Sequence, residues 1–406
     1  MFNNKIINDP VYGFLHVPSA FIYELIQHPF FQRLRRIKQL GVTDFVYPGA
    51  THTRFQHALG ALNLMTKAVD TLRNKQVEIT ENEAEALYAG ILLHDVGHGP
   101  YSHSLENTIV SNVAHEKISF LLMQKLNKAF NGRLDLMLEI FSNQYHKTFL
   151  HQLISSQLDM DRLDYLSRDS FFTGVIEGQV GAERIISMLN VVDNELVVEE
   201  KGIYSIEKFI IARRLMYWQV YLHKAVVASD ILLINIMKRA KFLCEKGFVF
   251  EITKPLNYFL TQKISLEQLA NDEHSLENFI QLDDSDIICA IKYFQHFEDF
   301  VISTLAKNFI ERKLPKLILS PKPIGADIIS EKKADILNKN LINENDLGYF
   351  INSGVLKNDA YLVDKHNSIK VLKKNNQVID VAEASDNYNL KALKDTVKKY
   401  YLSYYR

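Results

Sequence analysis

The chain has 406 residues, of which 47% are hydrophobic and 11% aromatic, a composition typical of globular proteins and a length sufficient for two or three domains. Its 47 basic and 48 acidic residues leave a net charge of -1, which excludes a global attraction to nucleic acid or to a membrane surface. Because it has only two cysteines and shows neither an apolar signal core nor an apolar run of membrane length, we expect a protein of the reducing cytoplasm.

Short hairpins and amphipathic helices are predicted for the first 250 residues. One hairpin is expected over residues 5–17, where apolar residues flank Asn-Asp-Pro and Gly. Another is expected over residues 188–206, where Asp193-Asn194-Glu195 separates two β-branched runs. Apolar spacing, caps and helix breakers predict helices over residues 18–40, 54–72, 80–95, 115–126, 149–172 and 207–247, with a further one beginning at His103.

The composition changes after residue 250. Residues 251–313 are predicted to form ordinary acidic helices. Short strands are expected over residues 317–320, 361–364, 368–372 and 378–381. A last helix, rich in Lys and Tyr, is expected from Leu390 to the end, either as a subunit interface, which we favour, or as a cover for the small sheet. The prediction is a mainly α fold with small β-hairpins over residues 1–245 and a C-terminal α+β part over residues 246–406.

An apolar run, Tyr88–Leu93, leads directly into His94 and Asp95 and then into a Gly-His-Gly-Pro break. Ionisable groups seldom end so apolar a segment, because burying an unpaired charge is unfavourable. Two hydrogen-bonded polar residues of the core would explain His94 and Asp95 alone. However, His98 and His103 follow within nine residues of His94. A metal ion would reconcile this cluster, since imidazole and carboxylate groups both bind divalent ions.

Further residues of the same chemistry lie on other predicted helices. His57 lies on the inner face of one helix, where a lone histidine is more often a core residue than a ligand. Asp161 lies in another amphipathic segment. With His94 and Asp95 these residues make a mixed nitrogen and oxygen set, which suits Mn, Fe, Zn, Ni or Mg better than a closed structural zinc site. The set is accompanied by more acid–base groups than a structural metal needs: His98, His103, Glu106 and His115.

These motifs carry a resemblance to a known family. The order His57, His94-Asp95, Asp161 resembles the H…HD…D signature of the HD superfamily of metal-dependent phosphohydrolases. Longer motifs resemble its deoxynucleoside triphosphate triphosphohydrolases, namely Phe31-Gln32-Arg33-Leu34-Arg35 with Lys38-Gln39-Leu40-Gly41, Arg54-Phe55-Gln56-His57, the run from His94 to His103, and Asp161-Arg162-Leu163-Asp164-Tyr165 with Arg168-Asp169. The resemblance covers roughly residues 5–240. It implies an HD-type phosphohydrolase domain over residues 1–245 and a regulatory or oligomerisation region over residues 246–406.

The resemblance also implies an activity, which is hydrolysis of a dNTP to deoxynucleoside and inorganic triphosphate, with dGTP favoured by analogy. One or two divalent ions, most simply Mn, would acidify a water and polarise the α-phosphoryl group. The implied metal ligands are His57, His94, Asp95 and Asp161. The implied catalytic groups are His103 with Glu106 as the acid–base pair, and His98 and His115 facing the phosphates. The implied substrate contacts are Arg54, Arg162 and Arg213 for the phosphates, and Gln39, Leu40, Tyr165, Asp169 and Tyr221 for the sugar and base.

Some residues depart from the family pattern. Arg162 stands where relatives often have Lys, a conservative but not equivalent change for a phosphate contact. Leu222 stands where some relatives have Gln, so base selectivity stays open. Gln27 occupies the place of an acidic residue that reads guanine in nucleotide-regulated members, which gives no support for activation by GTP. Gln32 and Arg35 still resemble effector-site residues, so a dNTP effector stays open. Because family members are commonly oligomers, we expect a homo-oligomer, with a tetramer favoured.

Two other functions are compatible with parts of the sequence. The first is a phosphodiesterase or phosphatase that has the same scaffold and acts on another nucleotide. The three implied phosphate-binding arginines and the sugar pocket argue against it, because they favour a triphosphate substrate. The second is a nucleotide sensor or nucleic-acid-binding protein with little turnover. The presence of every metal ligand and acid–base residue argues against lost activity, and the neutral charge balance argues against nucleic acid as the main partner.

Overall fold

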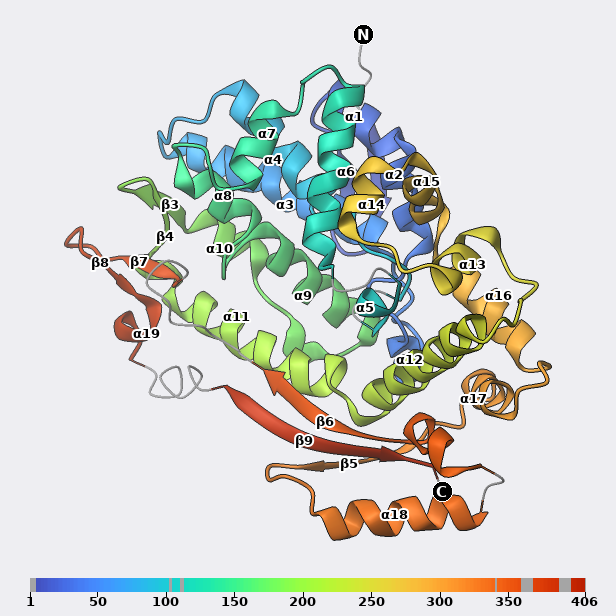
Figure 1. Ribbon diagram of the computed structural model, residues 1–406. Helices are drawn as coiled ribbons and strands as arrows, with labels where there is room; N and C mark the ends of the chain where they lie inside the picture. Colours follow the sequence, from blue (N-terminus) through green and yellow to red (C-terminus); the bar gives the residue numbers. More distant parts are fainter. Residues whose placement is uncertain are drawn as a thin grey trace.

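The computed structural model describes residues 5–101, 104–109, 113–339, 342–358, 368–386 and 396–405. Most of these residues are helical, which confirms the mainly α prediction (Figure 1). The helices of the first 245 residues are α1 (Ala20–Gln27), α2 (Pro29–Gln32), α3 (Arg54–Asn74), α4 (Glu81–Leu93), α5 (Glu106–Ile109), α6 (His115–Ala129), α7 (Asp135–Phe141), α8 (Thr148–Ile154), α9 (Met160–Thr173), α10 (Ala182–Ser187), α11 (Ile203–Met216) and α12 (Lys224–Glu245). The later helices are α13 (Lys254–Thr261), α14 (Leu266–Asn271), α15 (Glu273–Gln281), α16 (Asp284–Phe294), α17 (Phe300–Ile310), α18 (Ala326–Lys339) and α19 (Val381–Ala384).

Helix α3 lies at the centre of the helical part. It packs against both α4 and α9, and Figure 1 shows the three helices together within the bundle. Most of its residues are buried, including His57. Helix α4 begins with the predicted capping box of Thr80 and Glu83 and ends at His94. This arrangement brings the inner face of α3, the end of α4 and the start of α9 to one place.

Several predicted helices are interrupted in the structure. The helix expected over residues 18–40 breaks at His28, which is extended, because the ring of Pro29 disfavours helical backbone in the residue before it. It continues as α2 and the 3-10 helix η1 (Arg33–Arg36). The helix expected over residues 149–172 is divided into α8 and α9, and Asp159 caps the start of α9.

A π-helical turn, η6 (Tyr217–Tyr221), separates α11 from α12 where one helix was predicted. No single helix of the described ranges is long and apolar enough to cross a bilayer. The segments Glu200–Tyr221 and Lys224–Glu245, bent by 56°, meet the length and composition criteria only when they are taken together.

Three small sheets accompany the helices. Strands β1 (Ile6–Asp9) and β2 (Gly13–His16) form the predicted N-terminal hairpin. Strands β3 (Leu189–Val192) and β4 (Glu195–Glu199) form the second, and β4 also pairs in parallel with β7 (Lys370–Leu372), which pairs with β8 (Val378–Asp380). The third sheet has the order β5 (Lys316–Ser320), β9 (Val397–Tyr404), β6 (Ile351–Asn358), and in Figure 1 it lies between α18 and the helices α11 and α12.

The C-terminal part corrects two predictions. The helix expected from Leu390 to the end is wrong over residues 397–404, which form the central strand of the third sheet. Helix α18 and strand β6 were not predicted. The strands expected over residues 317–320, 368–372 and 378–381 are confirmed within one or two residues, whereas residues 361–364 lie outside the described residues. The division at residue 245 stays a prediction, because β7 of the later part completes a sheet with β4 of the earlier one.

Candidate metal centre and substrate site

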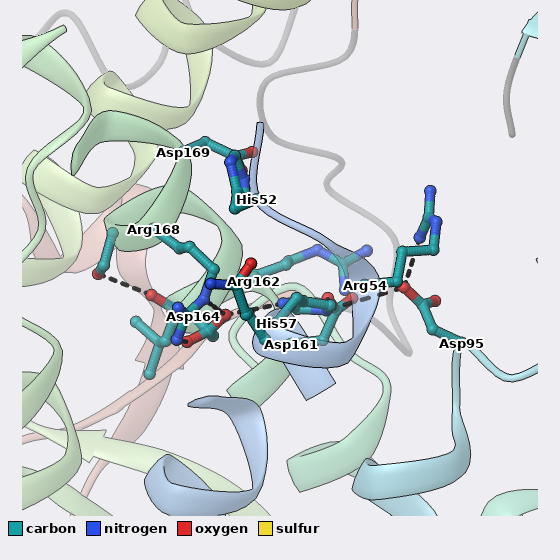
Figure 2. A network of polar contacts seen from close by, with 12 residues as sticks. His52, Arg54, His57, Asp95, Asp161, Arg162, Asp164, Arg168 and Asp169 are labelled. Carbon is teal, nitrogen blue, oxygen red and sulfur yellow. Dashed lines mark hydrogen bonds and ion pairs between the residues drawn. The ribbon is translucent and has the colours of Figure 1, made fainter. Parts of the chain in front are cut away.

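Four predicted metal ligands converge from three helices. The Nε2 atom of His57, on α3, lies 3.1 Å from Oδ1 of Asp161, in the first turn of α9. It also lies 3.3 Å from Nε2 of His94, which caps the end of α4. His94 Nε2 in turn lies 3.4 Å from Asp95 Oδ1 and 3.5 Å from Asp161 Oδ1. Figure 2 shows His57 beside Asp161, with Asp164 on one side and Arg54 and Asp95 on the other.

The spacing of these atoms fits a divalent cation. With bonds of about 2.1 Å, donors around one ion lie about 3.0 Å apart in an octahedron and about 3.4 Å apart in a tetrahedron. The chemistry of the donors agrees as well. Because His94 Nδ1 donates to the Ile91 carbonyl at 2.6 Å, its Nε2 presents a lone pair to the centre. Imidazole nitrogen and carboxylate oxygen in this mixture suit a transition metal or Mg.

A buried network outside the centre orients His57. Its Nδ1 lies 2.8 Å from Oδ2 of Asp164, so His57 also presents Nε2 to the centre. Asp164 accepts two hydrogen bonds from Arg168, at 2.9 and 3.0 Å, and Arg168 donates a further one to Asp9 of strand β1 at 2.8 Å. Asp164 and Arg168 therefore form an i,i+4 ion pair within α9 (Figure 2). Its link to His57 was not foreseen.

The centre strongly favours positive charge. Burial opposes protonation of His57, but hydrogen bonds with Asp161 and Asp164 outweigh it and raise its pKa to about 10. Burial alone would raise the pKa of Asp161, whereas its contacts with His57 and His94 lower it strongly. The carboxylates therefore stay ionised and stabilise a cation, either a proton on the imidazoles or a metal ion.

A second group of acid–base residues adjoins Asp95. His98 Nε2 lies 3.2 Å from Asp95 Oδ1, and the His98 ring stacks on His115 with centroids 3.7 Å apart. His115 Nδ1 lies 2.7 Å from Oε1 of Glu106, which also accepts from the His115 backbone. Burial and the charge of Arg54 hold the pKa of His98 well below its usual value, so this imidazole is neutral. The implied partner of Glu106, His103, lies outside the described residues.

The residues predicted to contact phosphates lie around the metal centre. Arg54 Nη1 is 2.5 Å from Asp95 Oδ2, and Arg162 is hydrogen-bonded to Asp159. Arg213 and Arg162 both act electrostatically on the Tyr165 hydroxyl, and Asp161 acts on it as well, so these side chains are neighbours.

Two of the predicted sugar and base contacts, Asp169 and Tyr221, share one network of hydrogen bonds. Asp169 is 1% exposed, and it contacts His52 Nε2 at 2.7 Å through Oδ1 and the Tyr221 hydroxyl at 2.6 Å through Oδ2. The backbone N–H of Gln39 donates to the His52 carbonyl at 2.9 Å. Leu40 is half-buried and packs against the core. His52 was missed because nothing in its sequence neighbourhood marks it, although it stands only two residues before Arg54.

The two residues considered for an effector site contact each other. Arg35 Nε donates to Gln32 Oε1 at 2.9 Å, and Gln32 Nε2 donates to the Ile26 carbonyl at 2.6 Å. The Arg35 guanidinium lies 3.6 Å from the centre of the Phe55 ring. Phe55 directly follows Arg54 on α3, so these residues lie next to the start of the helix that carries His57.

Comparison with known proteins agrees with this geometry. The family described as HD domain matches residues 54–169, which include all four predicted metal ligands, and the HD associated region matches residues 180–240. Protein YwfO of Bacillus subtilis, described as uncharacterized, is 36% identical over 317 residues, covering 76% of this chain and 71% of the relative. The crystal structure of a phosphohydrolase from Bacteroides thetaiotaomicron is 50% identical, with a TM-score of 0.95 over 100% of both chains.

The chain therefore belongs to the HD-domain family. Its resemblance to the deoxynucleoside triphosphate triphosphohydrolases is also confirmed by relatives of that name. The SAMHD1 homolog of Dictyostelium discoideum is 30% identical over 55% of this chain and 46% of the relative. The human protein SAMHD1 is 28% identical over 79% of this chain and 59% of the relative.

Proposed function

We propose that the protein is a metal-dependent triphosphohydrolase that converts a dNTP, with dGTP favoured, into deoxynucleoside and inorganic triphosphate. In this reaction water adds to the α-phosphorus, the bond between that phosphorus and O5′ breaks, and O5′ takes up a proton. When bound, a divalent cation, with Mn favoured, supplies Lewis-acid stabilisation of a phosphoryl oxygen and lowers the pKa of a water. His57, His94, Asp95 and Asp161 would hold it.

The observation that carries this proposal is that three of the predicted substrate contacts have buried polar atoms without a partner. Within the part of the chain that the structure describes, Arg162 Nε, Arg213 Nε and Gln39 Oε1 are buried and have no hydrogen-bond partner. Buried polar atoms normally have hydrogen-bond partners, so unpaired atoms on these three residues favour a polar ligand. Two guanidinium donors suit an oligophosphate, and an amide acceptor suits a sugar hydroxyl or a base.

The remaining residues divide the work of the reaction. Arg54, Arg162 and Arg213 would stabilise the charge that develops on the phosphate chain. The neutral imidazole of His98 and the pair of His115 with Glu106 would donate or accept protons near Asp95. Tyr165 and the Asp169–Tyr221 pair would enclose the sugar, because Tyr165 lies one turn after the ligand Asp161.

The deciding experiment is an incubation of the full chain with Mn²⁺ and each dNTP, singly and in pairs, followed by separation of the products. Deoxynucleoside with intact triphosphate is expected, and Asp95→Ala is expected to abolish both. Asp193→Asn, in an exposed turn between β3 and β4, is the matched control and is expected to keep full activity. Release of monophosphate, or no turnover, would reject the proposal in favour of another HD-type hydrolase or a sensor.

Regulation and assembly are proposed on narrower grounds. Turnover of one dNTP only in the presence of a second would support an effector site at Gln32 and Arg35. A homo-oligomer, with a tetramer favoured, is proposed from the family resemblance, and light scattering of the purified chain tests it. The two cysteines, Cys244 and Cys289, are both free thiols, which supports a cytoplasmic location.

A further inference from the structure

Arg33 joins the histidine-rich loop to the C-terminal part of the chain. Its side chain is 1% exposed, and among the described residues it donates only to backbone carbonyls. Nη1 donates to Val96 at 3.1 Å and to His98 at 2.7 Å. Nη2 donates to Phe279 at 3.3 Å and to Leu282 at 3.2 Å, where helix α15 ends. A cation stabilises the carbonyl end of a helix, so one guanidinium ties that end to the loop.

A second connection reaches the same loop from the start of helix α16. Asp284 accepts a hydrogen bond from the Tyr101 backbone N–H at 2.9 Å and another from the Lys38 backbone N–H at 2.8 Å. Tyr101 is buried and has a φ of 46°, a left-handed conformation that is unfavourable for residues with a Cβ atom. Such a conformation persists only where the surroundings hold it. Here the holding contact comes from a residue 183 positions later in the chain.

The neighbouring carboxylate at this helix start has other partners. Asp283 is paired with Arg36 and accepts a hydrogen bond from the Ser285 backbone N–H at 2.8 Å. It is the N-cap of α16 and forms a capping box with Asp286, and among the described residues none of its hydrogen bonds or ion pairs reaches the loop from Val96 to Tyr101. The two adjacent aspartates therefore share a helix end and a charge, and both favour the charged form of Arg33. They differ in that only Asp284 accepts a hydrogen bond from the loop.

We propose that Arg33 and Asp284 are positioning residues, through which the α15–α16 junction (residues 279–284) fixes the backbone from Val96 to Tyr101. The loop contains His98, whose imidazole lies 3.2 Å from Asp95 and stacks on His115. The proposal rests on the proposed function in so far as His98 faces the phosphates. It gives the C-terminal part, which contains none of the predicted site residues, a direct role at the site.

The test compares Asp284→Ala with Asp283→Ala in the full chain. Hydrogen–deuterium exchange reports the loop directly, and faster exchange of the Tyr101 amide is expected in Asp284→Ala only. With Mn²⁺ and dGTP, kcat of Asp284→Ala is expected to fall by about 10- to 100-fold, because small displacements of a reacting group have effects of that size. The KM for dGTP is expected to stay near that of the unaltered chain. The amount of bound Mn²⁺, measured by elemental analysis, is also expected to stay the same. Asp283→Ala is expected to retain kcat.

Equal exchange of the Tyr101 amide and equal kcat in the two variants would overturn the proposal. If circular dichroism shows that Asp284→Ala is unfolded, Asp284→Asn and Asp283→Asn provide the same comparison with a smaller change. Failure of the proposed function is a separate result. In that case the unaltered chain releases no triphosphate, while the exchange measurement still decides whether Asp284 holds the loop.

Discussion

At the scale of single residues, Asp164 shows how a side chain with no predicted contact to substrate controls the centre. It is fully buried, and its Oδ2 lies 2.8 Å from His57 Nδ1 and 2.9 Å from Arg168 Nε. A carboxylate in this place fixes both the ring orientation and the tautomer of a metal-binding histidine. The arrangement leaves Nε2 of His57, which lies 3.1 Å from Asp161 Oδ1, as the nitrogen that faces the predicted metal centre.

We therefore predict that Asp164→Asn weakens the binding of Mn²⁺ by about 10- to 100-fold, the usual effect of removing such a partner. The amide carries no charge, and when its NH₂ faces Nδ1 it reverses the tautomer. Isothermal titration calorimetry with Mn²⁺ measures the affinity, circular dichroism checks the fold, and Asp193→Asn is the control. An affinity equal to that of the control would contradict the prediction.

The sequence indicated four residues that the structure brings together, but it missed the residues that contact them from behind. His57, His94, Asp95 and Asp161 could be recognised because they stand at helix ends or inner faces in a known order. His52 and the link from Asp164 to His57 could not be recognised, because they depend on how α3 and α9 cross. Asp164 and His57, for example, are 107 residues apart in the sequence. Spacing within one helix carries no information about a partner on another.

At the scale of elements, the crossing of α3 with α9 depends on a glycine. A Cβ atom on Gly60 would lie 2.0 Å from Asp164 Oδ1 and 2.2 Å from Arg168 Nη2. These two atoms belong to the buried ion pair and have no room to move away. The absence of a side chain at Gly60, one turn after His57, therefore leaves the space that the Asp164–Arg168 ion pair occupies.

Gly60→Ala is predicted to destabilise the protein by about 1–3 kcal/mol, the usual range for overpacking a core. Helix propensity alone predicts the opposite, a gain of about 1 kcal/mol. Chemical denaturation measures the free energy of unfolding. The control is Gly348→Ala, where the added Cβ meets no atom within 4 Å and the change is expected to be small. If Gly60→Ala instead stabilised the protein, α3 and α9 would be able to move apart without a loss of stability, and the prediction would be wrong.

The start of helix α4 predicts a dependence on pH. Burial raises the pKa of Glu83, but hydrogen bonds from the Thr80 backbone, Lys147 and Tyr145 outweigh it, so the net pKa lies below the usual 4.5. A carboxyl group with a lowered folded pKa adds stability above its unfolded pKa and loses it as the pH falls through the folded value.

Glu83→Gln is accordingly predicted to lower the Tm at pH 7, where the charge faces Lys147 at 3.0 Å. The difference from the unaltered chain is predicted to shrink as the pH falls below 4.5. Calorimetric scans from pH 7 to acid pH measure it. The control is Glu81→Gln, two residues earlier, where an exposed carboxylate is paired with Arg73. A difference between Glu83→Gln and the unaltered chain that is constant with pH would refute the argument.

Local patterns predicted elements well where the cause of the structure is local. The capping box at Thr80 and the turn at Asp193 and Asn194 mark their elements, and both turn residues have positive φ, as a tight hairpin requires. Residues 397–404 were misread as helix because their strand is defined by pairing with β5 and β6, up to 88 residues away in the pair Lys316 and Tyr404. Aromatic residues favour strands only when such partners exist.

At the scale of the whole molecule, the later part of the chain completes the earlier part. Strand β7 pairs in parallel with β4, with Val371 opposite Val198. The α15–α16 junction supplies the carbonyl partners of Arg33 and the carboxylate that holds Tyr101. The match to the HD associated region ends at residue 240, but residues of the matched regions also contact later parts of the chain.

We predict that residues 1–245 do not fold cooperatively alone. Without residues 246–406, the Arg33 guanidinium loses two of its four acceptors, and a buried charge without partners is unfavourable. The apolar surface of α12 that α13 and α17 now cover would also be exposed. Thermal unfolding followed by circular dichroism is expected to show a broad transition for the fragment, and coexpression with residues 246–406 is expected to restore a sharp one. A sharp transition for the fragment alone would instead establish residues 1–245 as an independent domain and limit the later part to its proposed roles in positioning and assembly.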